Sequence, residues 1–335
     1  MLPQKINNQS KVNLIYTSSP VEKEDWNDFV FALGKLKQMF PNLNFFEVQR
    51  TELDPRYLSG SEDERLKKFR QSLKEVNWLA PIYGGTGCID IVRRLNEEDL
   101  DKLRKTRPIV NGFSDTTSLI NYLYFKLKLI TFHFANVAGI FDTKNSKLFF
   151  DIIFGKKKSF SFLENNYKWL SPVGAPKQKI EGIAIGGNFT VFRDLLDICD
   201  LKPRSWEDFI LFIEEYDMDM EDSHPDIIAL DQKGVFKHIK AIVLGRIAEP
   251  EFKSDLQKLN YIFGRQKEQE KMSSVFEYLI SDTIKERLVK NDPLYILKVD
   301  NFGHNVKTNP MIVPIGGKTI IHPDKKIEFV GPFVE

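Results

Sequence analysis

The sequence has few of the features that mark a secreted, membrane-bound or metal-stapled protein. It contains two cysteines, Cys88 and Cys199, among 335 residues, which are too few for a four-ligand zinc site or a disulfide framework. No apolar run approaches the roughly 20 residues of a membrane-spanning helix. The first twenty residues also lack the apolar centre of a signal peptide. We therefore expect a cytoplasmic protein with no membrane partner and no metal.

Net charge is also nearly absent. The chain has 48 Lys and Arg against 47 Asp and Glu, which gives a formal charge of +1, so the sequence does not indicate a nucleic-acid partner. Its 42% hydrophobic and 28% charged residues are ordinary for a globular protein. Its length fits two domains or one large one.

The first half alternates strand-like and helix-like segments. Such alternation predicts a parallel sheet covered by helices on both faces. Ser61 and Glu64 have the spacing of a capping box at the start of one helix. The expected strands are residues 11–17, 43–49, 77–83, 108–113 and 129–134, and the expected helices are residues 24–40, 61–76 and the segment after Ser114.

The alternation stops near residue 160, where Pro, Gly and Lys accumulate. We predict an N-terminal α/β domain over 1–160, a linker over 161–177 and a C-terminal β-rich domain over 178–335. A highly charged helical segment around 251–272 interrupts the short strands of the second half. These strands are expected at residues 179–187, 209–215, 240–247, 293–300, 318–322 and 326–330.

Ser114 follows the fourth expected strand, in the stretch NGFSDTTSL. A serine at a helix start most often caps the helix. The alternative is a nucleophile elbow, a tight turn that lifts the hydroxyl above the sheet. The G-x-S-x-G pattern of α/β-hydrolases fails, because Thr116 stands where the second glycine belongs.

A glycine turn, GGTG at residues 84–87, ends the third expected strand. It does not fit the dinucleotide-binding fingerprint, so no organic cofactor is indicated. It is either a plain turn or a loop whose backbone N–H groups approach a substrate closely. Cys88 follows directly and is more often a small buried residue than a nucleophile.

A serine nucleophile needs a base and an acid that orients it. Among the five histidines, His304 lies in the loop-like stretch NFGHN after an expected strand. Glu214 ends the apolar run FILFI, and a carboxylate there must find a partner because its burial is costly. The plainer alternatives are a surface histidine and a structural ion pair.

Several motifs, taken together and in order, resemble the LD-carboxypeptidase family of serine peptidases, which includes murein tetrapeptide carboxypeptidases and microcin C immunity peptidases. The similarity covers nearly the whole chain. The motifs are KVNLIYTSSP, GSEDER, YGGTG, GFSD, EGIAIGGN, FILFIEE, AIVLGRI, and GHN followed by MIVPIGGKTIIH.

The resemblance implies Ser114 as the nucleophile, His304 as the general base and Glu214 as the residue that orients it. The backbone N–H groups of Gly85 and Asp115 would form the oxyanion hole. The implied fold is α/β, with a flavodoxin-like parallel-sheet N-terminal domain and a smaller β-rich C-terminal domain. The implied assembly is a homodimer, and no cofactor is implied.

The expected reaction is hydrolysis of an L,D-amide bond that releases a terminal D-amino acid from a murein peptide. Two departures affect the expected substrate. HFANVAG replaces an H-G-P-like stretch after residue 132, and Pro225 stands where the family has Arg. The alternatives are therefore an immunity-type amidase that acts on peptidyl- or aminoacyl-nucleotides, and a ligand-binding member without catalysis.

Overall fold

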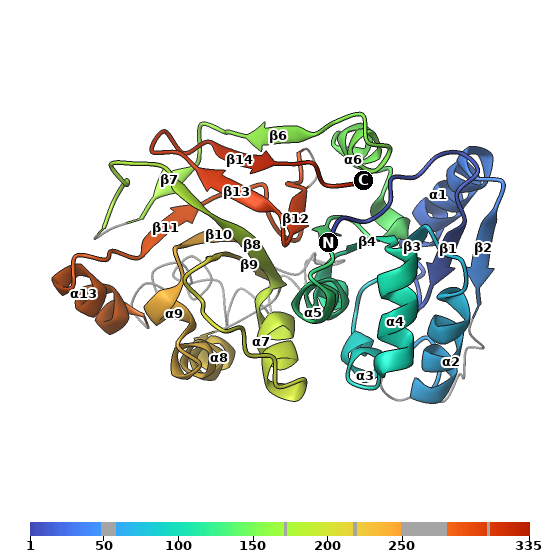
Figure 1. The fold of residues 1–335 in the computed structure, drawn as a ribbon, viewed down its shortest axis with the longest axis horizontal. Coiled ribbons are helices and arrows are strands. Elements are labelled where there is room, and N and C mark those ends of the chain that lie inside the picture. Colours follow the sequence, from blue (N-terminus) through green and yellow to red (C-terminus); the bar gives the residue numbers. More distant parts are fainter. Residues whose placement is uncertain (48–57, 171–172, 217–219, 249–279, 307–308) are drawn as a thin grey trace, which may run out of the picture.

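The computed structural model describes residues 1–47, 58–170, 173–216, 220–248, 280–306 and 309–335. They form two β-sheets, each flanked by helices, with the N-terminal half of the chain around one sheet and most of the C-terminal half around the other (Figure 1). The charged segment predicted around 251–272 lies outside the described residues.

The first sheet has six strands in the order β12-β5-β4-β3-β1-β2. Its five N-terminal strands are parallel, and β12 is antiparallel to β5. The order 2-1-3-4-5 is that of flavodoxin-like folds, as expected from the sequence. The strands are β1 (Val12–Ile15), β2 (Leu43–Phe46), β3 (Trp78–Pro81), β4 (Ile109–Gly112), β5 (Thr131–His133) and β12 (Val313–Ile315).

The helices of this half include three that the sequence predicted: α1 (Trp26–Met39), α2 (Glu62–Ser72) and, after Ser114, α5 (Thr117–Leu127). The Ser61 hydroxyl caps α2 by accepting the N–H of Glu64 at 3.2 Å. The remaining elements are α3 (Cys88–Val92), α4 (Glu97–Thr106), η1 (Ser114–Thr116), η2 (Val137–Gly139) and α6 (Ser146–Ile153).

The second sheet has eight strands in the order β6-β14-β13-β8-β9-β10-β11-β7. Four central strands are parallel, and antiparallel strands complete both edges. Its strands are β6 (Ser159–Phe162), β7 (Lys168–Trp169), β8 (Ile180–Asn188), β9 (Phe209–Tyr216), β10 (Ala241–Ala248), β11 (Tyr295–Lys298), β13 (Lys318–Ile321) and β14 (Ile327–Val330). Its helices are α7 (Phe189–Ile198), α8 (Met220–Gln232), α9 (Val235–His238) and α13 (Ser281–Val289).

The predicted fold class is confirmed: a parallel-sheet α/β half precedes a half built on a separate β-sheet. The sheets do not divide the chain at a single point. Strand β12 comes from the C-terminal half and pairs with β5 of the first sheet. The segment 161–177, predicted as a linker, contributes to edge strands of the second sheet through β6 and β7. The domain limits 1–160 and 178–335 stay a prediction.

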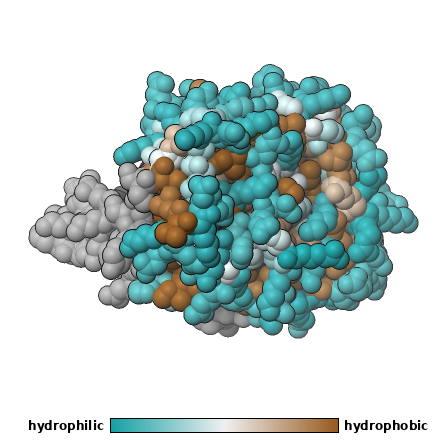
Figure 2. Space-filling view, turned by 60° about the vertical axis from the view of Figure 1, so that its left-hand side comes forward, coloured by the Kyte–Doolittle hydropathy of each residue, from teal (hydrophilic) through white to brown (hydrophobic). Residues whose placement is uncertain are grey.

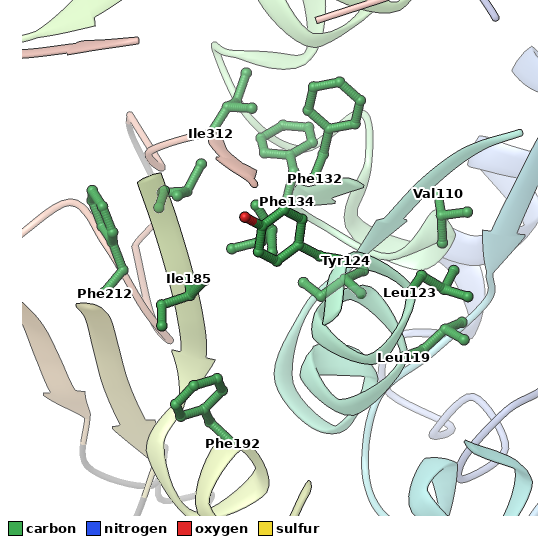
Figure 3. Close-up of a cluster of buried hydrophobic side chains, with 14 of the residues drawn as sticks. Val110, Leu119, Leu123, Tyr124, Phe132, Phe134, Ile185, Phe192, Phe212 and Ile312 are labelled. Carbon is green, nitrogen blue, oxygen red and sulfur yellow. The ribbon is translucent and has the colours of Figure 1, made fainter. Parts of the chain in front are cut away.

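Helix α5 lies between the two sheets, and apolar side chains from both sides surround it (Figure 3). Leu119 and Leu123 of α5 are fully buried, as are Phe132 of the first sheet and Ile185 of the second. A helix that is apolar around most of its circumference belongs in a protein interior. The hydrophobic core is therefore continuous from one sheet to the other.

Hydrophilic side chains cover most of the described surface on the face that Figure 2 shows, and hydrophobic ones form smaller patches between them. Among the described residues, no helix has both the length and the apolar character required to span a bilayer.

Candidate active site

Ser114 lies two residues after the last residue of β4, at the carboxyl end of a central strand of the first sheet. Its φ is +61°. This left-handed conformation costs a residue other than glycine about 1–3 kcal/mol and persists only where the surrounding structure imposes it. Ser114 does not cap either helix that follows, because the N-cap positions are Phe113 for η1 and Thr116 for α5. The capping interpretation is therefore wrong, and the strained turn fits an elbow.

The glycine turn packs against this elbow. A Cβ on Gly84 would lie 3.1 Å from Ser114 Cβ, so a larger residue would crowd the serine. Gly85 has a φ of +96°, and a Cβ there would lie 2.2 Å from Ser19 Oγ. The Ser19 hydroxyl accepts the N–H of Thr86 at 3.1 Å and so fixes the turn. The two regions expected to supply oxyanion donors are therefore neighbours.

The Asp115 side chain ties the elbow to the helix that follows the glycine turn. Its carboxylate accepts the N–H of Cys88 at 2.8 Å. Burial raises the pKa of Asp115 to about 6, although hydrogen bonds from Ser18 and Cys88 and the charge of Arg65 oppose the shift. Asp115 thus anchors the elbow through its side chain, while its N–H is the group predicted for the oxyanion hole.

Arg65 links the loops around the glycine turn. The side chain is fully buried and donates to the carbonyls of Thr17 at 2.6 Å and Gly87 at 2.7 Å. It also pairs with Asp90 at 2.9 Å. The motif GSEDER contains this arginine, but no pattern in the sequence predicted that its side chain would contact the turn.

Glu214 and His304, which are 90 residues apart in the chain, form a pair in which the Glu214 side chain is fully buried and the His304 side chain is 15% exposed. Glu214 lies near the end of β9, and His304 follows β11. The Nδ1 atom of His304 lies 2.6 Å from Glu214 Oε2, which also accepts the backbone N–H of His304 at 3.1 Å. Since a carboxylate only accepts, Nδ1 carries the proton.

Each member of this pair shifts the pKa of the other. Burial acts against the charged imidazolium, but the charge and hydrogen bond of Glu214 outweigh it, so the pKa of His304 lies above its ordinary value. Burial likewise opposes the Glu214 carboxylate, and His304 outweighs it, so the pKa of Glu214 lies below its ordinary value.

Phe113 connects the elbow to the pair. Its ring centroid is 4.5 Å from that of His304, and Phe113 is bonded directly to Ser114. The ring of Tyr216 lies 5.0 Å from His304. The structure thus brings the elbow of the first half beside the Glu214–His304 pair of the second.

His133 is a buried neighbour of the pair that the sequence did not indicate as functional. Its ring lies 5.4 Å from Phe113 and 4.8 Å from Phe302. Burial lowers the pKa of His133 to about 4, against the charge of Glu214, so the imidazole is neutral near pH 7. Its position in β5 is typical of a core residue. His133 comes close to the Glu214–His304 pair only because the two sheets pack together in the fold.

The cysteines do not compete for a catalytic role. Both thiols are free, and Cys88 is buried. Burial raises the pKa of Cys88 to about 12, with a further contribution from the charge of Asp115, which keeps it protonated. Within the described part of the chain, no group of three or more His, Cys, Asp and Glu side chains could hold a metal ion.

Comparison with known proteins places the chain in a peptidase family. Residues 12–134 match the model of the LD-carboxypeptidase N-terminal domain, and residues 181–321 match that of the C-terminal domain. The chain belongs to the LD-carboxypeptidase family.

Curated relatives are about a quarter identical to it over the aligned residues. A Vibrio cholerae protein, named provisionally as a carboxypeptidase, is 24% identical over 263 residues, which cover 70% of this chain and 76% of that protein. The microcin C7 self-immunity protein MccF of Escherichia coli is 25% identical over 218 residues, or 57% of this chain and 62% of MccF.

Solved structures share the fold. An MccF-like protein from Bacillus anthracis has a TM-score of 0.74 at 21% identity, with 99% of both chains covered. The muramoyltetrapeptide carboxypeptidase of Oxalobacter formigenes has a TM-score of 0.68 at 20% identity, with 97% of this chain and 100% of that chain covered.

Proposed function

We propose that this protein is a serine carboxypeptidase that hydrolyses an L,D-amide bond and releases a terminal D-amino acid from murein peptides. The observation that carries the proposal is the hydrogen bond between the buried Glu214 carboxylate and His304, with the imidazole packed against the residue that precedes Ser114. Family membership and the similarity to a muramoyltetrapeptide carboxypeptidase support the substrate class.

In the first half of the reaction, Ser114 Oγ attacks the amide carbonyl while His304 Nε2 takes the hydroxyl proton. Nε2 is available for this because Nδ1 donates to Glu214, and the carboxylate stabilises the imidazolium that forms. The negative charge on the carbonyl oxygen is stabilised by the N–H groups of Gly85 and Asp115 and by the helix N-terminus behind them.

The tetrahedral intermediate then collapses to the acyl-enzyme, and the imidazolium gives its proton to the departing amine of the D-amino acid. His304 then removes a proton from water, which attacks the acyl group on Ser114. Release of the acid returns the proton to Ser114 Oγ. Every proton therefore passes through a single imidazole.

A second candidate is an amidase that acts on aminoacyl-nucleotides. Structures of MccF contain aspartyl sulfamoyl adenosine and glutamyl sulfamoyl guanosine, and one of these has a TM-score of 0.74 to this chain. The departures of HFANVAG and Pro225 from the family pattern are compatible with such a substrate. The ordered Glu214–His304 pair argues against the third candidate, a ligand-binding protein without catalysis.

The test is an activity panel with the wild-type protein and Ser114→Ala. We expect release of D-Ala from a defined murein tetrapeptide, with kcat/KM reduced about 10⁴-fold or more by the substitution. Exclusive hydrolysis of an aminoacyl sulfamoyl adenosine would replace the first candidate with the second. Equal activity of Ser114→Ala on either substrate would reject both. The cytoplasmic location and the homodimer stay predictions.

A further inference from the structure

One buried amide, that of Asn136, lies directly against the elbow. Asn136 belongs to the short segment between β5 and η2, where HFANVAG departs from the family pattern. Its side chain is buried, with 7% of the residue exposed. It has no part in the reaction steps above, yet it contacts both regions that flank Ser114.

The amide of Asn136 binds both polar groups of the Phe113 backbone. Oδ1 accepts the Phe113 N–H at 3.2 Å, and Nδ2 donates to the Phe113 carbonyl at 3.1 Å. The same oxygen lies 3.1 Å from Thr116 Oγ1. Two hydrogen bonds of the amide are therefore directed at the Phe113 backbone, and a third forms when the Thr116 hydroxyl donates to Oδ1.

Thr116 closes the same arrangement from the other side of Ser114. Its hydroxyl accepts the Phe113 N–H at 2.6 Å and lies 2.9 Å from the Phe113 carbonyl. Having one proton, it donates either to that carbonyl or to Asn136. Phe113, Thr116 and Asn136 thus form one hydrogen-bonded unit around the strained serine.

Asn136 also reaches the glycine turn. A Cβ on Gly84 would lie 3.5 Å from Asn136 Nδ2 and 3.1 Å from Ser114 Cβ. The side chain therefore touches the two regions whose N–H groups we assign to the oxyanion hole. Because the Phe113 ring lies against His304, displacement of this backbone would move the serine relative to its base.

We propose that Asn136 is a positioning residue, which holds the Phe113 backbone so that Ser114 keeps its left-handed conformation in register with His304 and the glycine turn. The inference rests on the proposed function, since it assumes that Ser114 is the nucleophile. Small misplacements of reacting groups reduce rates steeply, so loss of the amide should affect the chemical step more than substrate binding.

The test compares Asn136→Ala with Asn13→Ala. Asn13 is a matched control, since it is also a buried asparagine, with side-chain hydrogen bonds to the Ser72 carbonyl and Asn44. It lies near the start of β1, whereas the elbow follows the carboxyl end of β4. Both variants lose buried hydrogen bonds, but only Asn136→Ala loses those to the elbow.

For Asn136→Ala we expect kcat lower by about 10- to 100-fold, with KM changed less than about threefold. The rate constant for phosphonylation of Ser114 by a fluorophosphonate, with loss of fluoride, should fall equally, while the final stoichiometry stays at the wild-type value. Asn13→Ala should lower Tm but keep both rates. All measurements are made well below the Tm of each variant.

The outcomes separate this inference from the proposed function. Wild-type rates in Asn136→Ala, even with a lowered Tm, would reject the positioning role and leave the proposed function intact. No labelling of Ser114 in the wild-type protein would reject both. If Asn136→Ala does not fold, Thr116→Val is tested in its place, because it removes the hydroxyl that contacts both Phe113 and Asn136. It should slow the labelling of Ser114 by the fluorophosphonate about three- to tenfold. A wild-type labelling rate in this variant would reject the positioning role.

Discussion

Two adjacent carboxylates at the end of β9 have different surroundings. Glu214 pairs with His304, whereas Glu215 accepts hydrogen bonds from Asn188 at 2.5 Å and from the N–H groups of Thr190 and Tyr216 at 2.9 Å. Burial raises the pKa of Glu215, with a contribution from the charge of Glu214, against these hydrogen bonds. Adjacent strand residues point to opposite faces, so only one of the two can meet the histidine.

The choice between them shows what the residues alone could predict. The apolar run ending in EE indicated a buried carboxylate, and the stretch NFGHN indicated a loop histidine. Their pairing depends on β9 and the loop after β11 meeting across a sheet, which no local pattern encodes. The family resemblance named Glu214 and His304, and the geometry places these two in contact.

At this scale, the pH dependence of activity is testable through Glu214→Gln. The reaction needs neutral His304, whose pKa lies above the ordinary value, so wild-type kcat/KM should rise with pH through a midpoint above about 6.5. Removal of the Glu214 charge leaves burial, which lowers the pKa, so this midpoint should move to lower pH. The maximal kcat should fall about 10²- to 10⁴-fold.

The control for this experiment is Glu215→Gln, since the charge of Glu215 contributes less to the pKa of His304 than burial or Glu214 does. Its midpoint should move less than that of Glu214→Gln. A pH profile of Glu214→Gln with the wild-type midpoint would contradict the orienting role. The measurement is kcat/KM across about pH 5 to 9 for all three proteins, at equal ionic strength.

At the scale of elements, the strands inside both sheets were predictable, whereas three of the four edge strands were not. All five parallel strands of the first sheet and six strands of the second coincide with predicted segments. Strands β6, β7 and β12 were missed. Of these, β6 and β12 are no shorter than the predicted strand β5, but each of the three lies at the edge of a sheet and is stabilised by pairing with a strand distant in the sequence. Helix α7 had a local signal that was overlooked: the Asn188 side chain caps it by accepting the N–H of Val191.

The loop after β11 offers a test at this scale. Gly303 has a φ of +119°, and a Cβ there would lie 2.8 Å from Glu214 Cβ and 3.0 Å from its Oε2. Gly303→Ala should push the His304 loop away from Glu214. We expect kcat/KM to fall about 100-fold or more, and the free energy of unfolding to fall by about 1 kcal/mol or more.

Gly174→Ala is the matched control, because Gly174 also has a positive φ, of +70°, but no heavy atom of the described residues would lie within 4 Å of a Cβ there. Gly174→Ala should lower the free energy of unfolding, because alanine is strained at a positive φ, but it should keep wild-type activity. Equal activity of the two variants would mean that the close approach of Gly303 to Glu214 has no functional importance. Enzyme assays and urea denaturation provide the two measurements.

At the scale of the whole molecule, α5 joins the two sheets through one core. Its Asn121 side chain accepts the Gly186 N–H at 2.9 Å and donates to the Gly186 carbonyl at 2.8 Å, which links the helix to β8. Apolar contacts on both sides of α5 continue this link (Figure 3). Because the elbow begins this helix, the core that joins the halves also fixes Ser114 relative to the second sheet.

We therefore expect both halves to unfold in one cooperative transition. Leu123→Ala, at a fully buried position of α5, should lower the free energy of unfolding by about 2–5 kcal/mol. Leu163→Ala is the control, since Leu163 is 54% exposed and should change it by less than about 0.5 kcal/mol. Urea unfolding followed by circular dichroism and by tryptophan fluorescence should give coincident curves in each protein. Separate midpoints for the two signals would show that the halves unfold independently.

The return of β12 to the first sheet limits how the gene can be divided. A fragment that stops at residue 160 would contain every parallel strand of that sheet but not residues 313–315, which cover the edge of β5. It would expose unpaired backbone groups of β5 to other chains, together with the side of α5 that normally meets β8. Such a fragment should self-associate on expression, and co-expression with the complementary piece should recover soluble material.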